Sequence, residues 1–321
     1  MKIALTGSIA YDYLMSFPGQ FREHFLEDKL DTISLSFLVN RMIKRRGGIA
    51  PNIGYTMAML GGQAILFGTV GEDFHEYRKW LEEAGVDTRG VKVIPNEFTA
   101  SFFATTDTTN NQIASFYPGA MSHAAQVKLS EWQGETLDLV VISPNDPTAM
   151  INYVQEAKQL GIPYLYDPSQ QIVRLDGEDL REGVKGAFAL FVNEYEFCLI
   201  KKHTGLTEEE IEQQVPLMVI TNGEHGAEIS AEGEKYHIPV VPPQTISDPT
   251  GVGDAFRGGF LTGYSFGMGW QVCGEMGALA ATYCLETDGP QGHHFTPASF
   301  IQRYRSHFDD QGGLDILRKK S

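Results

Sequence analysis

Short apolar runs alternate with longer amphipathic stretches along most of the chain. The apolar runs predict strands over residues 3–5, 64–70, 137–142, 164–166, 190–192 and 217–220. The amphipathic stretches predict helices over residues 49–60, 74–84, 147–160, 254–264, 270–286 and 297–305. Apolar strands separated by helices are typical of a parallel sheet that is covered by helices on both faces. We therefore predict a three-layer α/β/α protein with a mainly parallel sheet.

Two segments, 11–46 and 97–118, interrupt this alternation. Leu35, Phe37 and Val39 recur at every second position of the first segment, and the second segment alternates in the same way. A period of two indicates strands with one exposed face. We expect the two segments to pair into one small sheet that acts as a lid over the active site. The prediction divides the chain into a large domain over 1–10, 47–96 and 119–321 and a β lid over 11–46 and 97–118.

The amino-acid composition argues against several classes of binding partner. The 321 residues include 41 acidic and 25 basic side chains, which give a net charge of −16. A surface this acidic argues against nucleic acid or an anionic membrane as the main partner. The three cysteines show no Cys-x-x-Cys spacing, so a disulfide framework or a zinc site is not expected, and a reducing cytoplasm fits. We see no signal peptide and no apolar run long enough to cross a membrane, and we expect a cytoplasmic location.

The segment 248–254, Asp-Pro-Thr-Gly-Val-Gly-Asp, precedes a predicted helix. Its small residues leave the backbone N–H groups of Val252, Gly253 and Asp254 bare at the helix start, where the helix dipole also favours an anion. The Asp254 carboxylate can take a proton from a hydroxyl group at the same place. An anion hole over residues 251–254 beside a general base describes phosphoryl transfer to an alcohol.

Two further expectations concern this helix start. The dipole should lower the pKa of Asp254, so that the carboxylate is ionised and weakly basic. Arg257 follows one turn later on the same helix face and is a candidate phosphate contact, with a structural ion pair as the alternative. A glycine-rich loop without function is the alternative reading of Gly251 and Gly253.

Other polar residues follow predicted strands, where ligands bind in parallel sheets. Asp167, Asn193 and Thr221 each come directly after or at the end of an apolar run. No Gly-x-x-x-x-Gly-Lys-Ser/Thr motif occurs, and no Gly-x-Gly-x-x-Gly motif occurs, which argues against a P-loop and against a dinucleotide-binding domain.

The chain resembles the ribokinase (PfkB-type) family of carbohydrate and nucleoside kinases. The likeness is carried by residues 47–54, 68–74 and 248–259, in this order. Residues 6–12, 34–39, 114–121 and 167–171 are similar to the bacterial adenosine kinases within that family. The resemblance implies a ribokinase-like fold and ATP-dependent phosphorylation of the adenosine 5′-hydroxyl to AMP, a purine-salvage reaction that uses Mg²⁺.

The resemblance also implies contacts to the nucleoside. Asp12 follows a strand, and a carboxylate that accepts from vicinal hydroxyls both orients and selects a sugar; a turn-forming role is its alternative. The other implied sugar contacts are Ser8, Ser36, Gly48 and Asn52. Aromatic rings offset the cost of removing a purine from water, so lid aromatics are expected to stack on the base. The implied base contacts are Phe102 and Phe116, by stacking, and Gln170 and Gln171, at the purine edge.

At the nucleotide end, Asn193 and Glu196 match the Asn-x-x-Glu motif of the family, with a helix cap as the alternative. The resemblance implies that Glu196 holds Mg²⁺ through water. It also implies nucleotide contacts from Thr221, Gly223 and Gly226, a K⁺ site near Asp248 and Thr250, and a homodimer formed through the lid. His225 stands where relatives often have lysine, so a cationic contact to ATP is not expected there.

Two alternatives stay open. Another sugar or nucleoside kinase of the same family, ribokinase-like or fructokinase-like, would share these motifs. A purine-nucleoside binding or sensing protein built on a kinase scaffold would keep the pocket without the reaction.

Overall fold

A large sheet forms the body of the molecule in the computed structural model, which describes residues 1–25 and 34–319. Among these residues the strand order is β13-β12-β11-β10-β9-β8-β1-β4-β5. The strands are β1 (Lys2–Thr6), β4 (Gln63–Val70), β5 (Asp87–Val93), β8 (Leu139–Ile142), β9 (Tyr164–Tyr166), β10 (Ala189–Asn193), β11 (Leu217–Thr221), β12 (Ala227–Ala231) and β13 (Glu234–Ile238). All neighbours pair in parallel except β11–β12 and β12–β13. The predicted mainly parallel sheet is confirmed.

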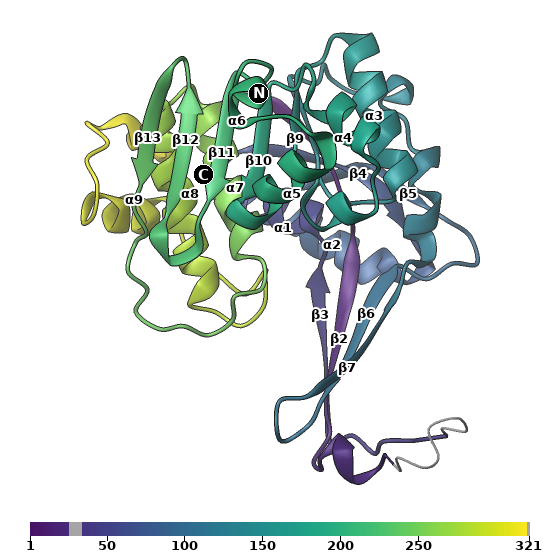
Figure 1. Cartoon of the computed structure of the whole chain (residues 1–321). Helices are drawn as coiled ribbons and strands as arrows, with labels where there is room; N and C mark the ends of the chain where they lie inside the picture. Colours follow the sequence, from purple (N-terminus) through teal and green to yellow (C-terminus); the bar gives the residue numbers. More distant parts are fainter. Residues whose placement is uncertain (26–33, 320–321) are drawn as a thin grey trace.

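Helices cover both faces of this sheet (Figure 1). They are α1 (Ile49–Met59), α2 (His75–Glu83), α3 (Pro147–Leu160), α4 (Gly177–Val184), α5 (Glu194–Thr204), α6 (Glu208–Glu212), α7 (Val252–Ser265), α8 (Trp270–Leu285) and α9 (Pro297–Arg305). One core cluster joins α1, α2, α7 and α8 to the sheet, and a second joins α3, α4, α5 and α6 to its other face. Alternate residues of each strand feed the two clusters, because successive side chains point to opposite faces. The three-layer α/β/α prediction is confirmed.

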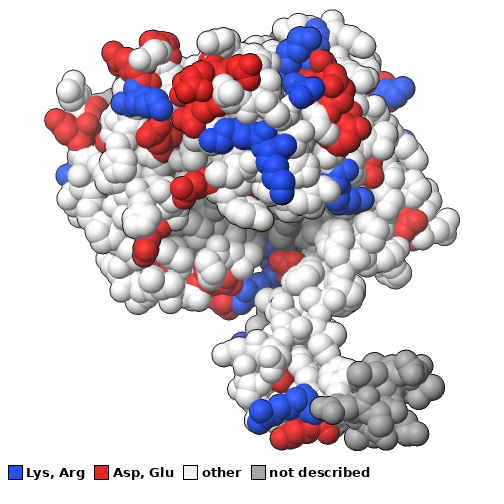
Figure 2. All heavy atoms as spheres, viewed as in Figure 1, with Lys and Arg blue, Asp and Glu red and all other residues white. Residues whose placement is uncertain are grey.

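A second sheet extends away from the large sheet (Figure 1). Its order is β3-β2-β6-β7, built from β2 (Ala10–Ser16), β3 (Arg41–Gly47), β6 (Ala100–Thr106) and β7 (Gln112–Tyr117). These strands come from the two segments that break the α/β alternation, as the period of two predicts. On the face that Figure 2 shows, the shaft of this small sheet presents few charged side chains, whereas charges of both signs gather on the body; β3 itself carries Arg41, Lys44, Arg45 and Arg46. Its role as a lid stays a prediction.

Some predicted elements differ from the structure. Residues 34–39 form no strand, although Leu35, Phe37 and Val39 alternate. The Phe37 ring instead packs edge-on against Phe17 and Phe21, which a strand pattern does not anticipate. The predicted elements do not include the polar strands β5, β12 and β13, of which β5 and β13 are the sheet edges, or the helices α4, α5 and α6. No helix within the described ranges is long and apolar enough to span a membrane.

Candidate active site

The N-terminus of α7 lies at the end of the loop that the sequence singles out. Gly251 has a φ of 80°, and a Cβ at this position would collide with the ring of Pro290, so only glycine fits. Within the described part of the chain, the amides of Gly253 and Asp254 donate to no protein acceptor, and that of Val252 makes a long 3.4 Å bond to Pro249 O. Two free amides at a helix N-terminus form an anion-binding site.

Asp254 is half-buried beside these amides. Its Oδ2 accepts a 2.8 Å hydrogen bond from Asn52 Nδ2. Burial raises the pKa of Asp254 to about 7, although Arg257 and Asn52 lower it. The prediction of a lowered pKa was therefore wrong, because removal from water outweighs the helix dipole and the nearby cation. A carboxylate with a pKa near 7 is a stronger base than an exposed one.

Arg257 forms a buried ion pair with Asp167 across 2.6 Å. Ser143 Oγ donates to the second oxygen of Asp167 at 2.9 Å. Arg257 also borders the anion hole, because a Cβ on Gly253 would lie 3.0 Å from Arg257 Nη1. The Asp167 ion pair therefore fixes a guanidinium group next to the two free amides.

Glu196 is engaged at the start of α5. Asn193 Oδ1 accepts from the Glu196 amide at 2.8 Å, and Glu196 Oε2 accepts from the Asn193 amide at 2.8 Å, which is a capping box. Ser169 Oγ donates to Glu196 Oε1 at 2.9 Å. Both carboxylate oxygens are thus in use, which fits a contact to Mg²⁺ through water. Over residues 1–25 and 34–319, no three His, Cys, Asp or Glu side chains cluster in a way that could hold a metal directly.

Asp248 precedes the anion hole and faces the small sheet. Its carboxylate accepts from Arg45 Nη1 at 2.6 Å, from the Thr250 amide at 2.9 Å and from the Gly289 amide at 3.2 Å. Burial would raise the pKa of Asp248, but these hydrogen bonds lower it overall. The Arg45 guanidinium thus pairs with the Asp248 carboxylate, and the K⁺ site implied near Asp248 and Thr250, mainly through backbone oxygens, stays a prediction.

The predicted sugar contacts surround the N-terminus of α1. Asp12 lies on β2, where burial raises its pKa against the lowering effect of Arg45. Gly48 has a φ of 94° and is packed against the backbone of Ser8 to Ala10, which only glycine permits. Ser8 Oγ accepts from the Ile49 amide at 3.3 Å. Asp12, Gly48 and Asn52 thus come from elements that meet beside Asp254, whereas Ser8 serves the helix start.

Phe102 and Phe116 are paired across β6 and β7. Phe102 is also in register with Asp12 and hence shares its face, and Asp12 in turn is in register with Arg45. Because Arg45 contacts Asp248, this face of the small sheet is the one turned toward the anion hole. The two rings are therefore on the face that the stacking prediction requires.

The remaining predicted contacts are one to the sugar, Ser36, and two to the base, Gln170 and Gln171. Ser36 is exposed in the segment that precedes β3. Gln170 is exposed and accepts from Ser169 Oγ at 3.0 Å. Gln171 is buried, and its Oε1 has no hydrogen-bond partner within the described chain. Of the two glutamines, Gln171 is the one with a free acceptor.

A hollow of about 350 Å³ lies at the carboxyl ends of β10 and β11. It is lined by Glu194, Phe197, Cys198, Lys201, Glu208, Ile220, Asn222, His225, Ala227, Glu228 and His237. Thr221, Gly223 and Gly226 are neighbours of Asn222 and His225 in the same turn, and a φ of 88° at Gly226 shapes it. The predicted nucleotide residues thus border a cavity on the same sheet edge as Asp167.

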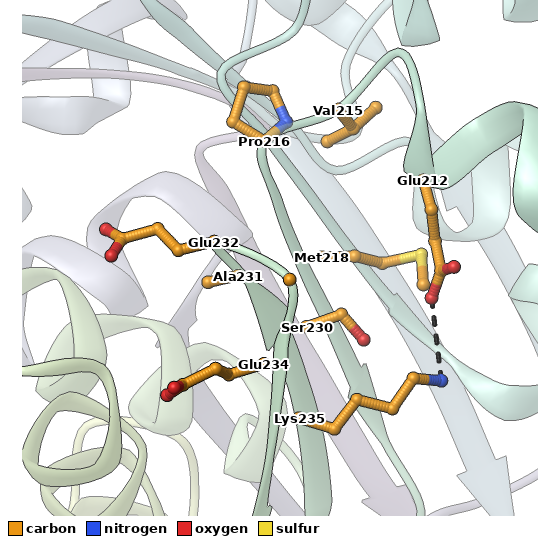
Figure 3. Close-up of a pocket in the computed structure, with 10 residues that line it drawn as sticks. Glu212, Val215, Pro216, Met218, Ser230, Ala231, Glu232, Glu234 and Lys235 are labelled. Carbon is orange, nitrogen blue, oxygen red and sulfur yellow. Dashed lines mark ion pairs between the residues drawn. The ribbon is translucent and has the colours of Figure 1, made fainter.

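Another hollow, of about 160 Å³, lies at the opposite end of β11 (Figure 3). Met218, the second residue of β11, lines the hollow, and Glu212 pairs with Lys235 across 3.5 Å at its rim. Three glutamates and one lysine line it, an acidic set that suits neither a phosphate nor the chemistry of α7. We therefore place the candidate site at the carboxyl edge of the sheet.

Several residues of this site were not predicted. Ser143 directly follows β8 just as Asp167 follows β9, so the strand-end signal could have found it. Arg45 and Gln291 carry no comparable signal, because their partners are more than 200 residues away in sequence.

Residues 23–295 match the model of the pfkB family carbohydrate kinases. The chain belongs to this family. It is 37% identical to the nucleoside kinase of Burkholderia thailandensis, solved in complex with inosine, over 95% of this chain and 98% of that one, with a TM-score of 0.83. It is 28% identical over 308 residues to the nucleoside kinase of Methanocaldococcus jannaschii, covering 95% of this chain and 97% of the relative. An adenosine kinase structure from Sinorhizobium meliloti, 18% identical with a TM-score of 0.71, shares the fold.

Proposed function

We propose that this pfkB-family kinase transfers the γ-phosphoryl group of ATP to the 5′-hydroxyl of a nucleoside, with adenosine as the predicted acceptor and AMP as the product. The observation that carries the proposal is the meeting of a basic carboxylate, Asp254, with two free helix-end amides and the Arg257 guanidinium. The similarity to nucleoside kinases along nearly the whole chain supports a nucleoside as acceptor.

The reaction uses these groups in one in-line step. Asp254 takes the proton of the 5′-hydroxyl as the oxygen–phosphorus bond forms and the bond from the γ-phosphorus to ADP breaks. A pKa near 7 leaves the base ionised in much of the protein at neutral pH and basic enough to accept that proton. The amides of Gly253 and Asp254 and the Arg257 guanidinium stabilise the charge on the transferred group. Glu196 would hold Mg²⁺ through water, and the ion would neutralise phosphate charge.

The sugar end is supported by Asp12, Asn52 and Gly48. The backbone N–H of Asn52 donates to Gly48 O at 3.1 Å, which holds the first turn of α1 against the end of β3. Asp12 supplies a carboxylate for the vicinal ribose hydroxyls, and its raised pKa shows how far it is already removed from water. A sugar lacking one of these hydroxyls would leave that carboxylate without a donor.

The base end is supported by the paired rings of Phe102 and Phe116. A purine between or against these rings gains stacking that a bare sugar lacks. The free Oε1 of Gln171 offers an acceptor to an N–H group of the base. Adenosine presents an amino group and inosine an N1–H, so either base could donate a hydrogen bond to this oxygen.

Inosine is the second candidate acceptor, because the 37% identical relative was solved with it and also with ADP-inosine. The test is a panel in which ATP-dependent nucleoside monophosphate formation is measured with adenosine, inosine, guanosine, cytidine, ribose and fructose. We expect the highest kcat/KM with adenosine. Faster turnover of inosine would move the acceptor within the nucleosides, and faster turnover of ribose or fructose would reject the proposed function.

We also propose a homodimer through the outer face of the small sheet. Tyr13, Met15, Met42, Phe103 and Ile113 share that face by register, and Met42 is 62% exposed. A hollow of about 670 Å³ beside them is lined largely by aromatic groups. Sedimentation should show a dimer that Ile113→Arg dissociates, while a monomer at all concentrations would reject this assembly.

A further inference from the structure

The Gln291 side chain joins three groups, from Trp80, Tyr77 and Asn52, into one hydrogen-bonded chain that leads to Asp254. Its Oε1 accepts from the Trp80 indole Nε1 at 3.2 Å. Its Nε2 donates to Asn52 Oδ1 at 2.9 Å and to the Tyr77 hydroxyl. Asn52 Nδ2 in turn donates to Asp254 Oδ2 at 2.8 Å. The chain therefore connects an indole on α2 to the proposed general base on α7.

Each end of this hydrogen-bonded chain has a fixed role as donor or acceptor. An indole N–H only donates, and a backbone carbonyl only accepts. The Tyr77 hydroxyl donates its one proton to Gly47 O at 2.9 Å, so it can only accept the hydrogen bond from Gln291. Burial holds the pKa of Tyr77 well above its usual value, which keeps that proton in place. Both ends therefore force Gln291 Oε1 toward Trp80 and Gln291 Nε2 toward Asn52.

This direction decides how the Asn52 amide faces Asp254. Because Gln291 Nε2 donates, Asn52 must present Oδ1 to it and Nδ2 to the Asp254 carboxylate. A flipped Asn52 would oppose its carbonyl oxygen to the carboxylate and leave two acceptors facing each other. Such a flip is otherwise inexpensive for an asparagine, because its oxygen and nitrogen have nearly the same shape.

We propose that Gln291 is a positioning residue for the general base: it holds Asn52 in the one orientation that donates to Asp254. The inference rests on the proposed function, since it assigns Asp254 as the base. A hydrogen bond to the charged form of a carboxylate favours that form, so Gln291 keeps Asp254 ionised at lower pH than burial alone would allow. It also fixes the oxygen that takes the proton.

The same hydrogen-bonded chain is anchored where the small sheet meets the body. Gly47 is the last residue of β3, and the Arg46 guanidinium lies 4.5 Å over the Trp80 ring. Other charged or titratable groups also act on the chain. Arg257, Asp167 and Cys284 interact with Asp254, and Arg46, Asp12 and Tyr11 interact with Tyr77. A Gln291 variant replaces none of these six side chains, and Gln291→Met adds no charge, so a shift in the titration of Asp254 in Gln291→Met can be traced to the lost amide.

Two variants separate the role of the Gln291 N–H donor from the shape and charge of the side chain. Gln291→Glu keeps the shape but has no donor, so Asn52 turns its Nδ2 toward residue 291 and its Oδ1 toward Asp254. Gln291→Met keeps the approximate length, adds no charge and leaves Asn52 unfixed. The control is Gln126→Glu, the same chemical change at an exposed position outside the site.

The readout is the acid limb of kcat against pH, measured with the acceptor that the panel identifies. Losing a hydrogen bond to a charged group should raise the apparent pKa of the limb by about one unit in Gln291→Glu. We expect Gln291→Met to shift it in the same direction by less, and Gln126→Glu to leave it in place. The loss of kcat near pH 6 should be about tenfold and should largely recover at pH 9. An unshifted limb in both Gln291 variants would overturn the inference.

A second readout needs no catalysis and so separates this inference from the proposed function. Because the folded pKa of Asp254 lies above its unfolded value, stability should fall as pH rises from about 4 to about 7, and Gln291→Met should extend that fall to higher pH. In an Asp254→Asn background this effect of Gln291→Met should vanish, because Met adds no titratable group of its own. If it persists there, Gln291 does not act through Asp254, whatever acceptor the enzyme uses.

Discussion

The two sides of the candidate site differ in how fully their groups are partnered. Around α7, Asp254 is bonded to Asn52, and Arg257 forms an ion pair with Asp167 that is almost fully buried. On the small sheet, Phe116 is 49% exposed. The contrast teaches that the reacting groups are fixed by the body before any ligand arrives, whereas the groups proposed to hold the base are presented on a separate sheet. Preorganised groups govern kcat, and presented groups govern acceptor binding.

Asp254→Asn should break the body side most severely. The variant keeps the shape and an acceptor for Asn52 but cannot take the proton, so kcat should fall roughly 10²- to 10⁴-fold. Calorimetry should still show acceptor binding, because the small sheet is unchanged. Unchanged turnover would remove Asp254 from the mechanism, and loss of acceptor binding would show that the two sides are not separable.

Gly251→Ala should damage the anion hole. A side chain there has a φ of 80° and meets Pro290, so the loop must move and displace the free amides. Loss of one such donor typically costs about 10²-fold in kcat. Gly267→Ala is the matched control, since Gly267 has a φ of 74° with open space around it. Equal losses of kcat in the two variants would point to backbone strain rather than to the anion hole.

Phe102→Ala tests the proposed base contacts on the small sheet. Loss of stacking on a base is worth about 1–3 kcal/mol, so the acceptor KM should rise about 5- to 150-fold with little change in kcat. Phe103→Ala is the neighbouring control on the opposite face, where its ring stacks on Tyr13 at 4.8 Å. A similar rise in KM from both variants would contradict the assignment of faces.

The pH dependence of the wild-type enzyme should follow the body side. Because burial raises the pKa of Asp254 to about 7, kcat should fall about tenfold per pH unit below that value. The measurement is a steady-state series from pH 5 to 9 at saturating acceptor and ATP. An acid limb near pH 4 would indicate an exposed, ordinary carboxylate.

The smallest effect is on stability. The folded pKa of Asp254, about 7, lies above its unfolded value of about 4, so the folded protein binds more protons between these limits and stability falls as pH rises. Asp254→Asn removes this penalty. Its Tm should exceed that of the wild type at pH 8, and the difference should vanish toward pH 4. A variant that is less stable at pH 8 would show that the carboxylate is not strained by burial.

The sequence predicts elements well where local signals agree. Helices α3 and α9 match their predicted ranges because a proline opens each one and an Asp or Thr caps it. The sequence signals the start of α5 only through Asn193 and Glu196. The structure bears out their alternative interpretation as a helix cap. Strands β12 and β13 were missed because alternate polar residues at a sheet edge lack an apolar run.

For the site, the loop and its base could be predicted, but its electrostatics could not. The sequence shows that Asp254 begins a helix, whereas the burial that raises its pKa depends on elements far away in the chain. The partners Asp167 and Arg257 were each noticed, yet nothing in the spacing of 90 residues says that they pair. Gln291 carries no motif at all, because its meaning arises only from Trp80, Tyr77 and Asn52.

The buried thiol beside the loop before α7 has a practical consequence. Cys284 is buried, and its Sγ donates to Thr250 O at 3.5 Å directly under the turn that Gly251 makes. Burial raises the pKa of Cys284 to about 12, so the sulfur stays protonated and a poor nucleophile. Alkylating reagents and mild peroxide should therefore react first at exposed Cys198, which lines the hollow beside β10 and β11, and should leave Cys284 unmodified.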